Sequence, residues 1–114
     1  MNMNVTPVAA PDLSRFRPRF LAGLNRRVEE LTAHAPMLEQ RDRLDATMRM
    51  FHSIAGLAGT FGFPALTNIS RQAERTCARA LEAGSLLTAV ERRTVVETID
   101  QLRAACSVDL QKAA

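Results

Sequence analysis

The 114-residue sequence predicts an all-α protein, an antiparallel up-down four-helix bundle with a short flexible N-terminal leader. Apolar residues recur at helical spacing in four segments, and short breaks that contain Pro or Gly separate them. The chain has five Phe but no Trp or Tyr, so aliphatic side chains and Ala must fill the interior, which favours helices over a sheet. A looser three-helix core with an appended N-terminal arm is the alternative architecture.

The N-terminal part divides into a leader and a first helix. Residues 1–11 carry Asn, Thr and Pro without periodicity, so we expect a flexible leader, and residues 12–114 form the helical domain. The first helix is expected to begin near Asp12 or at Pro18, since Pro suits a first helical turn, and to end near Ala35. Its inward stripe is Phe20, Leu21, Leu24, Val28 and Leu31, with Arg26, Arg27, Glu29 and Glu30 pointing away.

The second helix is expected from Leu38 to Phe61, where Gly62 and Pro64 provide a stop and a restart. Its inward stripe is Leu44, Met48, Phe51, Ala55 and Ala58, with Ile54 on the flank.

The third helix follows Pro64 and ends at the EAGS stretch, residues 82–85. Thr88 and Glu91 have the spacing of a capping box, which predicts the start of the fourth helix. The inward residues are Leu66, Ile69, Ala73, Cys77 and Ala80 in the third helix, and Val95, Ile99, Leu102 and Cys106 in the fourth.

Composition excludes several classes of function. The net charge is +3, but the arginines are spread along the chain among acidic residues, so the concentrated basic patch of a nucleic-acid-binding protein is missing. Cys77 and Cys106 lack a CxxC spacing and are expected to be buried thiols. No apolar run reaches 18 residues, so we expect no membrane segment, a cytoplasmic location and, because one bundle can cover all four stripes, a monomer.

His52 is the main candidate for chemistry. Each helical residue advances about 100°, so His52 lies on the flank of the second helix, one turn before Gly56 and two turns before Gly59. A glycine inside a helix costs about 1 kcal/mol relative to Ala, which suggests that another backbone approaches here. A neutral imidazole can accept and return a phosphoryl group or a proton. His34 is the only other histidine, and no metal-ligand set is completed.

The region around His52 resembles a known family. The relevant positions are His52, Ile54, Gly56, Ala58, Gly62, Leu66 and Glu74. Their spacing resembles the histidine-containing phosphotransfer (HPt) domain of two-component phosphorelays. This resemblance implies the four-helix bundle reached above, with the histidine exposed midway along one helix.

The resemblance also implies a function and partners. His52 would take a phosphoryl group from a response-regulator receiver domain or a hybrid histidine kinase and pass it to another receiver's aspartate. The module would have no catalytic machinery or cofactor of its own, because the receiver would supply the acidic pocket and Mg²⁺. Ala55, Gly56 and Gly59 are small enough to let the imidazole enter that pocket, and Met50, Ile54 and Leu57 are candidates for an apolar docking patch.

One residue departs from the family pattern. The family commonly has a lysine three residues after the histidine, and this sequence has Ala55. Arg49 or Arg71 could neutralise the phosphoryl group instead. The departure leaves two other hypotheses: a non-phosphorylated adaptor of the same fold that binds a receiver or kinase domain, and an enzyme that uses His52 as a general base.

Overall fold

The computed structural model describes residues 16–113, with side chains as far as residue 107. Within this range the order of elements is α1 (Arg17–His34), the 3₁₀ turn η2 (Ala35–Met37), α2 (Arg41–Thr60), α3 (Pro64–Ala83) and α4 (Ala89–Ala113). The predicted leader and the possible helix start near Asp12 lie outside the described residues.

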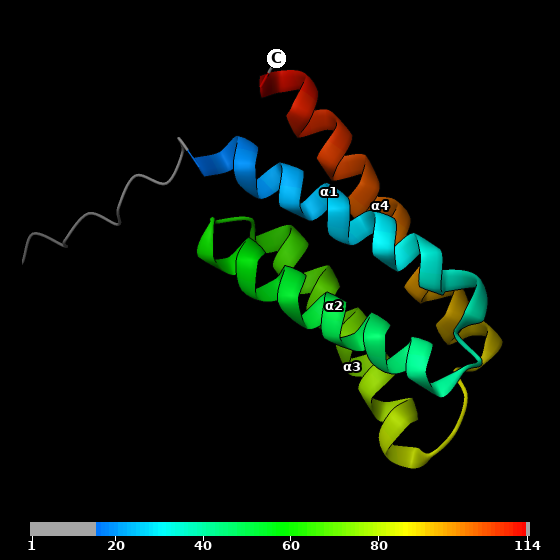
Figure 1. The fold of residues 1–114 in the computed structure, drawn as a ribbon. Coiled ribbons are helices and arrows are strands. Elements are labelled where there is room, and N and C mark those ends of the chain that lie inside the picture. The colour runs from blue at the N-terminus through cyan, green and yellow to red at the C-terminus, as the bar shows by residue number, and fades with distance from the viewer. Residues whose placement is uncertain (1–15, 114) are drawn as a thin grey trace, which may run out of the picture.

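The four helices form an antiparallel bundle (Figure 1). Helix α1 packs against α2 and α4, and α3 packs against the same two helices. Each helix therefore buries one stripe against two neighbours. The four-helix prediction is confirmed over the three-helix alternative.

The core consists largely of the predicted stripes. The buried apolar residues are Phe20, Leu21, Leu24, Val28, Leu31, Leu38, Leu44, Phe51, Ile54, Ala55, Ala58, Leu66, Ala73, Cys77, Ala80, Val95, Ile99, Leu102 and Cys106. Two predicted core residues, Met48 and Ile69, are only half-buried, and their neighbours Thr47 and Ser70 are fully buried. Thr47 can occupy the core because its hydroxyl donates to the Arg43 carbonyl at 2.8 Å.

The predicted start of the second helix was wrong by three residues. Helix α2 begins at Arg41, because Gln40 is extended, with φ −85° and ψ 125°. Leu38 is nevertheless buried. Leu38 lies in the connection between α1 and α2, and its buried side chain fixes this connection to the core. Helical spacing in the sequence does not distinguish such a residue from one inside the helix.

The connection between α2 and α3 is closed by backbone and aromatic contacts. Gly62 has φ +79°, a left-handed conformation that glycine adopts without strain. The Phe63 N–H donates to the Ala58 carbonyl at 2.8 Å. The Phe20 ring stacks on Phe61 and Phe63, with centroids 5.0 Å and 5.1 Å away. This end of the bundle ties α1 to both helices that carry the candidate site.

The connection between α3 and α4 has the predicted stop and start. Gly84 ends α3 with φ +65°, and the Ser85 N–H donates to the Ala80 carbonyl at 3.0 Å. The Thr88 N–H donates to Glu91 Oε1 at 2.9 Å, and the Glu91 N–H donates to Thr88 Oγ1 at 3.1 Å. The capping box is therefore confirmed.

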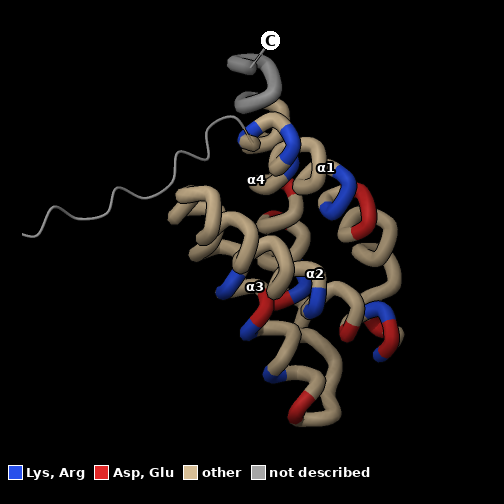
Figure 2. The backbone as a smooth tube through the Cα atoms, turned by 60° about the vertical axis from the view of Figure 1, so that its left-hand side comes forward, with Lys and Arg blue, Asp and Glu red and all other residues tan. Residues whose placement is uncertain are grey.

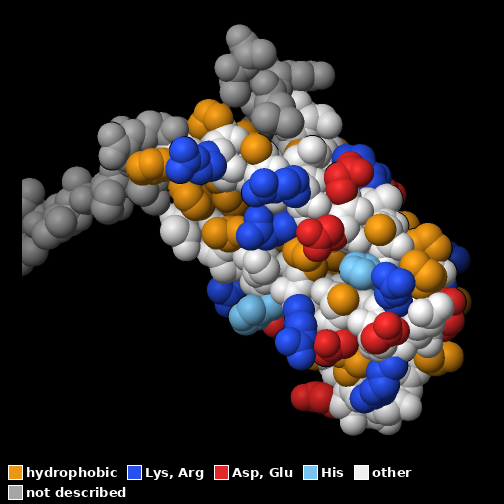
Figure 3. All heavy atoms as spheres, in the orientation of Figure 1, with side chains coloured by type: hydrophobic (Ala, Val, Ile, Leu, Met, Phe, Trp, Pro, Cys, Tyr) orange, Lys and Arg blue, Asp and Glu red, His pale blue; other side chains and the backbone are white. Residues whose placement is uncertain are grey.

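Charged side chains occupy the outer faces of the helices. Figure 2 shows basic and acidic positions distributed over the bundle, with both signs along the middle of α3. Basic side chains are prominent on the face drawn in Figure 3. Arg17, Arg19 and Arg26 of α1 are all exposed. Among the described residues, no helix is long and apolar enough to cross a membrane.

Candidate functional site

His52 lies near the middle of α2 with its ring in solvent. Its side chain is 77% exposed, while Phe51, the preceding residue, is fully buried. This placement follows from the 100° step between successive helical residues, because Phe51 points at the core. The imidazole is therefore accessible to another macromolecule.

Glu74 of α3 fixes the orientation of the imidazole. His52 Nδ1 lies 2.7 Å from Glu74 Oε2, and the Glu74 side chain is 26% exposed. A carboxylate can only accept hydrogen bonds, so Nδ1 carries the proton and donates it to Glu74. The lone pair of a neutral imidazole then resides on Nε2, on the other side of the ring. The contact thus leaves Nε2 unprotonated and without a partner from Glu74.

A cavity of about 190 Å³ lies beside the imidazole, between α2 and α3. It is lined by His52, Ala55, Gly56, Arg71 and Glu74. Five of the residues singled out from the sequence therefore come together in space. Ala55 and Gly56 leave room in this cavity, and Arg71 and Glu74 supply one charge of each sign.

Arg49 is not among the residues that line this cavity. Its Nε donates to Asp45 Oδ2 at 2.8 Å on the same helix, and its side chain is 76% exposed. It borders a different groove, toward α1. Of the two arginines considered from the sequence, only Arg71 lies in the cavity with His52.

The two glycines that follow His52 have different surroundings. A Cβ atom built on Gly56 would have no neighbour within 4 Å, whereas one on Gly59 would meet the Thr67 hydroxyl at 3.8 Å. Neither position is required to be glycine by packing within the described chain. Close approach to a neighbouring helix therefore does not explain Gly56, and approach by a partner is the remaining explanation of the two considered from the sequence.

The apolar docking patch expected beside His52 is not exposed. Ile54 is fully buried, and Met50 and Leu57 are half-buried against the core. The large exposed apolar side chains of the described residues are Leu86 and Val90, in the α3–α4 connection and the start of α4. The surface next to His52 is instead made of small and charged residues.

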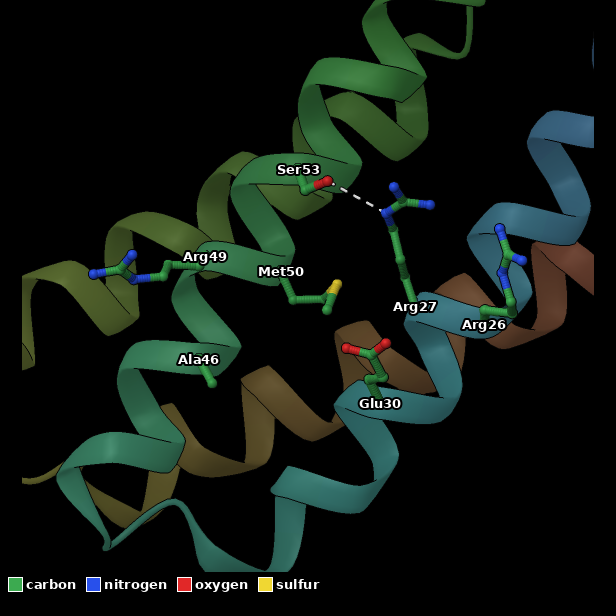
Figure 4. Close-up of a pocket in the computed structure, with 7 residues that line it drawn as sticks. All are labelled: Arg26, Arg27, Glu30, Ala46, Arg49, Met50 and Ser53. Carbon is green, nitrogen blue, oxygen red and sulfur yellow. Dashed lines mark hydrogen bonds between the residues drawn. The ribbon is translucent and has the colours of Figure 1, made fainter.

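A groove of about 580 Å³ lies between α1 and α2 on the surface, and its lining is drawn in Figure 4. Arg27 points across it toward α2, where its Nε donates to Ser53 Oγ at 3.3 Å. Its Nη1 also donates to the Gly23 carbonyl at 3.1 Å. Arg27 was expected to point away from the bundle, and that expectation was wrong. The signal for it is Gly23 one turn earlier, where the missing side chain leaves room for the guanidinium.

Other chemistry has less support within the described residues. No group of three or more His, Cys, Asp or Glu side chains is placed to hold a metal ion. Cys77 and Cys106 are both buried, as predicted. Burial raises the pKa of the Cys77 thiol to about 12, so this thiol is a poor nucleophile near neutral pH. His52, by contrast, is exposed and its ring is held by Glu74.

Comparison with protein families gives a match over most of the chain. The family model described as Hpt domain matches residues 15–105. Comparisons with curated proteins and with solved structures gave no match. The matched range includes α1, α2 and α3 and most of α4, and therefore contains His52 and every residue that lines its cavity.

Proposed function

Because the chain belongs to the Hpt domain family, whose members carry phosphoryl groups in two-component signalling, we propose that His52 is the residue that carries the group here. In this proposal His52 exchanges the phosphoryl group with the aspartate of a response-regulator receiver domain. The observation that carries the proposal is the exposed imidazole whose Nδ1 is held 2.7 Å from Glu74.

The exchange requires an in-line attack by Nε2. The Nε2 lone pair forms a bond to the phosphorus of the receiver's aspartyl phosphate as the bond between phosphorus and the carboxylate oxygen breaks. The bonding electron pair returns to the aspartate. Nδ1 keeps its proton throughout, so the phosphorylated ring carries a positive charge and needs no base to remove a proton.

Glu74 contributes to this exchange through geometry and charge. Holding Nδ1–H fixes the ring so that Nε2 points outward from α2, which reduces the entropy lost on reaching the reactive geometry. The carboxylate also stabilises the positive charge that develops on the ring as the Nε2–phosphorus bond forms. Both contributions act through the imidazole, because Glu74 contacts Nδ1 and not the phosphoryl group, so Glu74 is a positioning residue.

The partner would supply what the chain itself does not. In this proposal the receiver contributes Mg²⁺ and the acidic pocket, while the HPt chain contributes the oriented histidine and a docking surface, without a cofactor. The chain is then a phosphotransfer module in the cytoplasm and not an enzyme with its own active site. We also propose that it acts as a monomer, because each helix already covers its apolar stripe within the bundle.

Transfer of labelled phosphate tests the proposal directly. A receiver domain encoded in the same genome is phosphorylated, mixed with the chain, and the label on each protein is followed over time. We expect acid-labile label on the wild type and none on His52→Gln, which keeps a polar side chain but has no ring nitrogen. Equal labelling of the two proteins would contradict the assignment of His52.

Ala55 favours one second candidate, an adaptor of the same fold that is not phosphorylated. An alanine at the position where the family commonly has a lysine removes a cation that would neutralise a phosphoryl group. The adaptor would bind a receiver or kinase domain without accepting phosphate. It predicts receiver binding that survives His52→Gln, measured by calorimetry, together with no label on the wild type.

A further inference from the structure

We propose that Arg71 is the residue that binds the phosphoryl group carried by His52, so that the neutralising cation comes from α3 and not from the helix of the histidine. This inference rests on the proposed function, because it concerns the phosphorylated form of the same site. It assigns to Arg71 direct contact with the phosphoryl oxygens.

The need for a cation follows from the charges of the cavity. A phosphoryl group on Nε2 brings about two negative charges at pH 7 and above. Glu74 already places a carboxylate against the other nitrogen of the same ring, 2.7 Å from Nδ1. The positive charge on the phosphorylated ring offsets only part of this. A cation that extends from beside the ring toward Nε2 would neutralise the remainder.

Arg71 is the basic residue in the lining of that cavity. The other lining residues are the imidazole itself, Glu74 and the uncharged Ala55 and Gly56. Arg49, one turn before His52, is occupied by Asp45 at 2.8 Å. The structure therefore favours Arg71 over Arg49 as the cation beside His52.

The Arg71 guanidinium is also available to bind a new group. It is exposed, and within the described part of the chain it forms no hydrogen bond or ion pair. Binding a phosphoryl group would consequently break no existing contact of its guanidinium. The planar fork of N–H donors matches two phosphoryl oxygens, and such charge-assisted pairs are stronger than neutral hydrogen bonds.

The chain offers a matched control in Arg75. Arg75 lies one turn further along α3, is also exposed, and forms no hydrogen bond or ion pair within the described residues. It borders a different groove, with Gln72, Thr76, Arg79 and Thr94. Arg71→Ala and Arg75→Ala remove the same charge from the same helix, one from the cavity of His52 and the other from a groove that His52 does not line.

The experiment measures the equilibrium of phosphoryl transfer from a phosphorylated receiver to the full chain. For Arg71→Ala we expect the equilibrium constant to fall roughly three- to tenfold, since the cation acts at a site open to solvent. Arg75→Ala should stay within about twofold of the wild type. Arg71→Lys, which keeps the charge without the fork, should recover part of the loss. Thermal unfolding of each variant checks that the bundle is intact.

Phosphoramidate, a small phosphodonor, separates failure of this inference from failure of the proposed function. It phosphorylates histidine without a receiver, so partner docking does not enter. If the wild type is labelled on His52 and Arg71→Ala reaches the same transfer equilibrium as Arg75→Ala, the role of Arg71 is refuted and the proposed function stands. If neither phosphoramidate nor the receiver labels the wild type, both are refuted.

Discussion

Gly56 offers a test that separates folding from partner binding. In α2 it is exposed, and a Cβ added there would meet nothing within 4 Å, so Gly56→Ala has no steric cost within the described chain. Replacing a glycine by alanine inside a helix stabilises it by about 1 kcal/mol. For a domain of this length that corresponds to a rise in Tm of roughly 4 °C. Thermal unfolding followed by circular dichroism measures this change.

The same substitution should slow phosphotransfer. If a receiver packs against the surface next to His52, the added methyl overfills that contact, which costs roughly 1 kcal/mol or more and lowers the transfer rate at least about fivefold. Gly59→Ala is the control, because its Cβ would make an ordinary 3.8 Å contact with Thr67 and lies a turn further from His52. It should also raise Tm but leave transfer faster than in Gly56→Ala. Equal transfer rates in the two stabilised variants would refute the reasoning about close approach, and a lower Tm for Gly56→Ala would refute the packing argument.

Three further predictions concern the positioning residue, a buried thiol and a helix end. Glu74→Ala should lower the rate of phosphoryl transfer about tenfold. Glu74→Gln should lower it less, because the amide oxygen can still accept a hydrogen bond from Nδ1. The kinetics of labelling by the receiver compare the two variants, and equal losses of rate would show that only the charge of Glu74 matters. Burial raises the pKa of the Cys77 thiol in the folded chain to about 12, against about 9 in the unfolded chain. The stabilisation by the buried thiol is therefore complete below about pH 9, and the free energy of unfolding falls by about 1.4 kcal/mol per pH unit above it. Urea unfolding from pH 8 to pH 11 measures this slope, which should be smaller in Cys77→Ala. Gly62→Ala places a side chain at φ +79° and should lower the free energy of unfolding by about 1 kcal/mol or more, measured by urea unfolding against Gly56→Ala as the opposite case.

The fold was largely predictable from the sequence, because each helix has a continuous apolar stripe and the helix ends are marked by capping or helix-terminating residues. Gly62, Gly84 and the Thr88–Glu91 capping box mark helix ends through local backbone chemistry, which a single sequence contains. The start of α2 could not be predicted in the same way. Leu38 has helical spacing relative to later apolar residues, but it is buried from a turn.

The candidate site was predictable in part. The exposure of His52 follows from helical geometry. The family resemblance alone singled out Glu74, and the structure places it against His52 Nδ1. The sequence also contained a reason to discount Arg49, since Asp45 precedes it by one turn and such pairs interact on a helix surface. The position of Arg71 depends on how α3 lies against α2, which no pattern within one helix specifies.

The α2–α3 connection determines which residues meet across the site. His52 and Glu74 are equally far in sequence from Phe63. The same is true of Ala55 and Arg71, which line one cavity, and of Gly59 and Thr67, since a Cβ atom built on Gly59 would lie 3.8 Å from the Thr67 hydroxyl. The two helices thus form a hairpin whose register is set at Phe63. A single inserted or deleted residue in this connection would turn α3 by about 100° relative to α2 and separate all three pairs together. A loop several turns away from the imidazole is therefore as much a determinant of its chemistry as the residues that touch it.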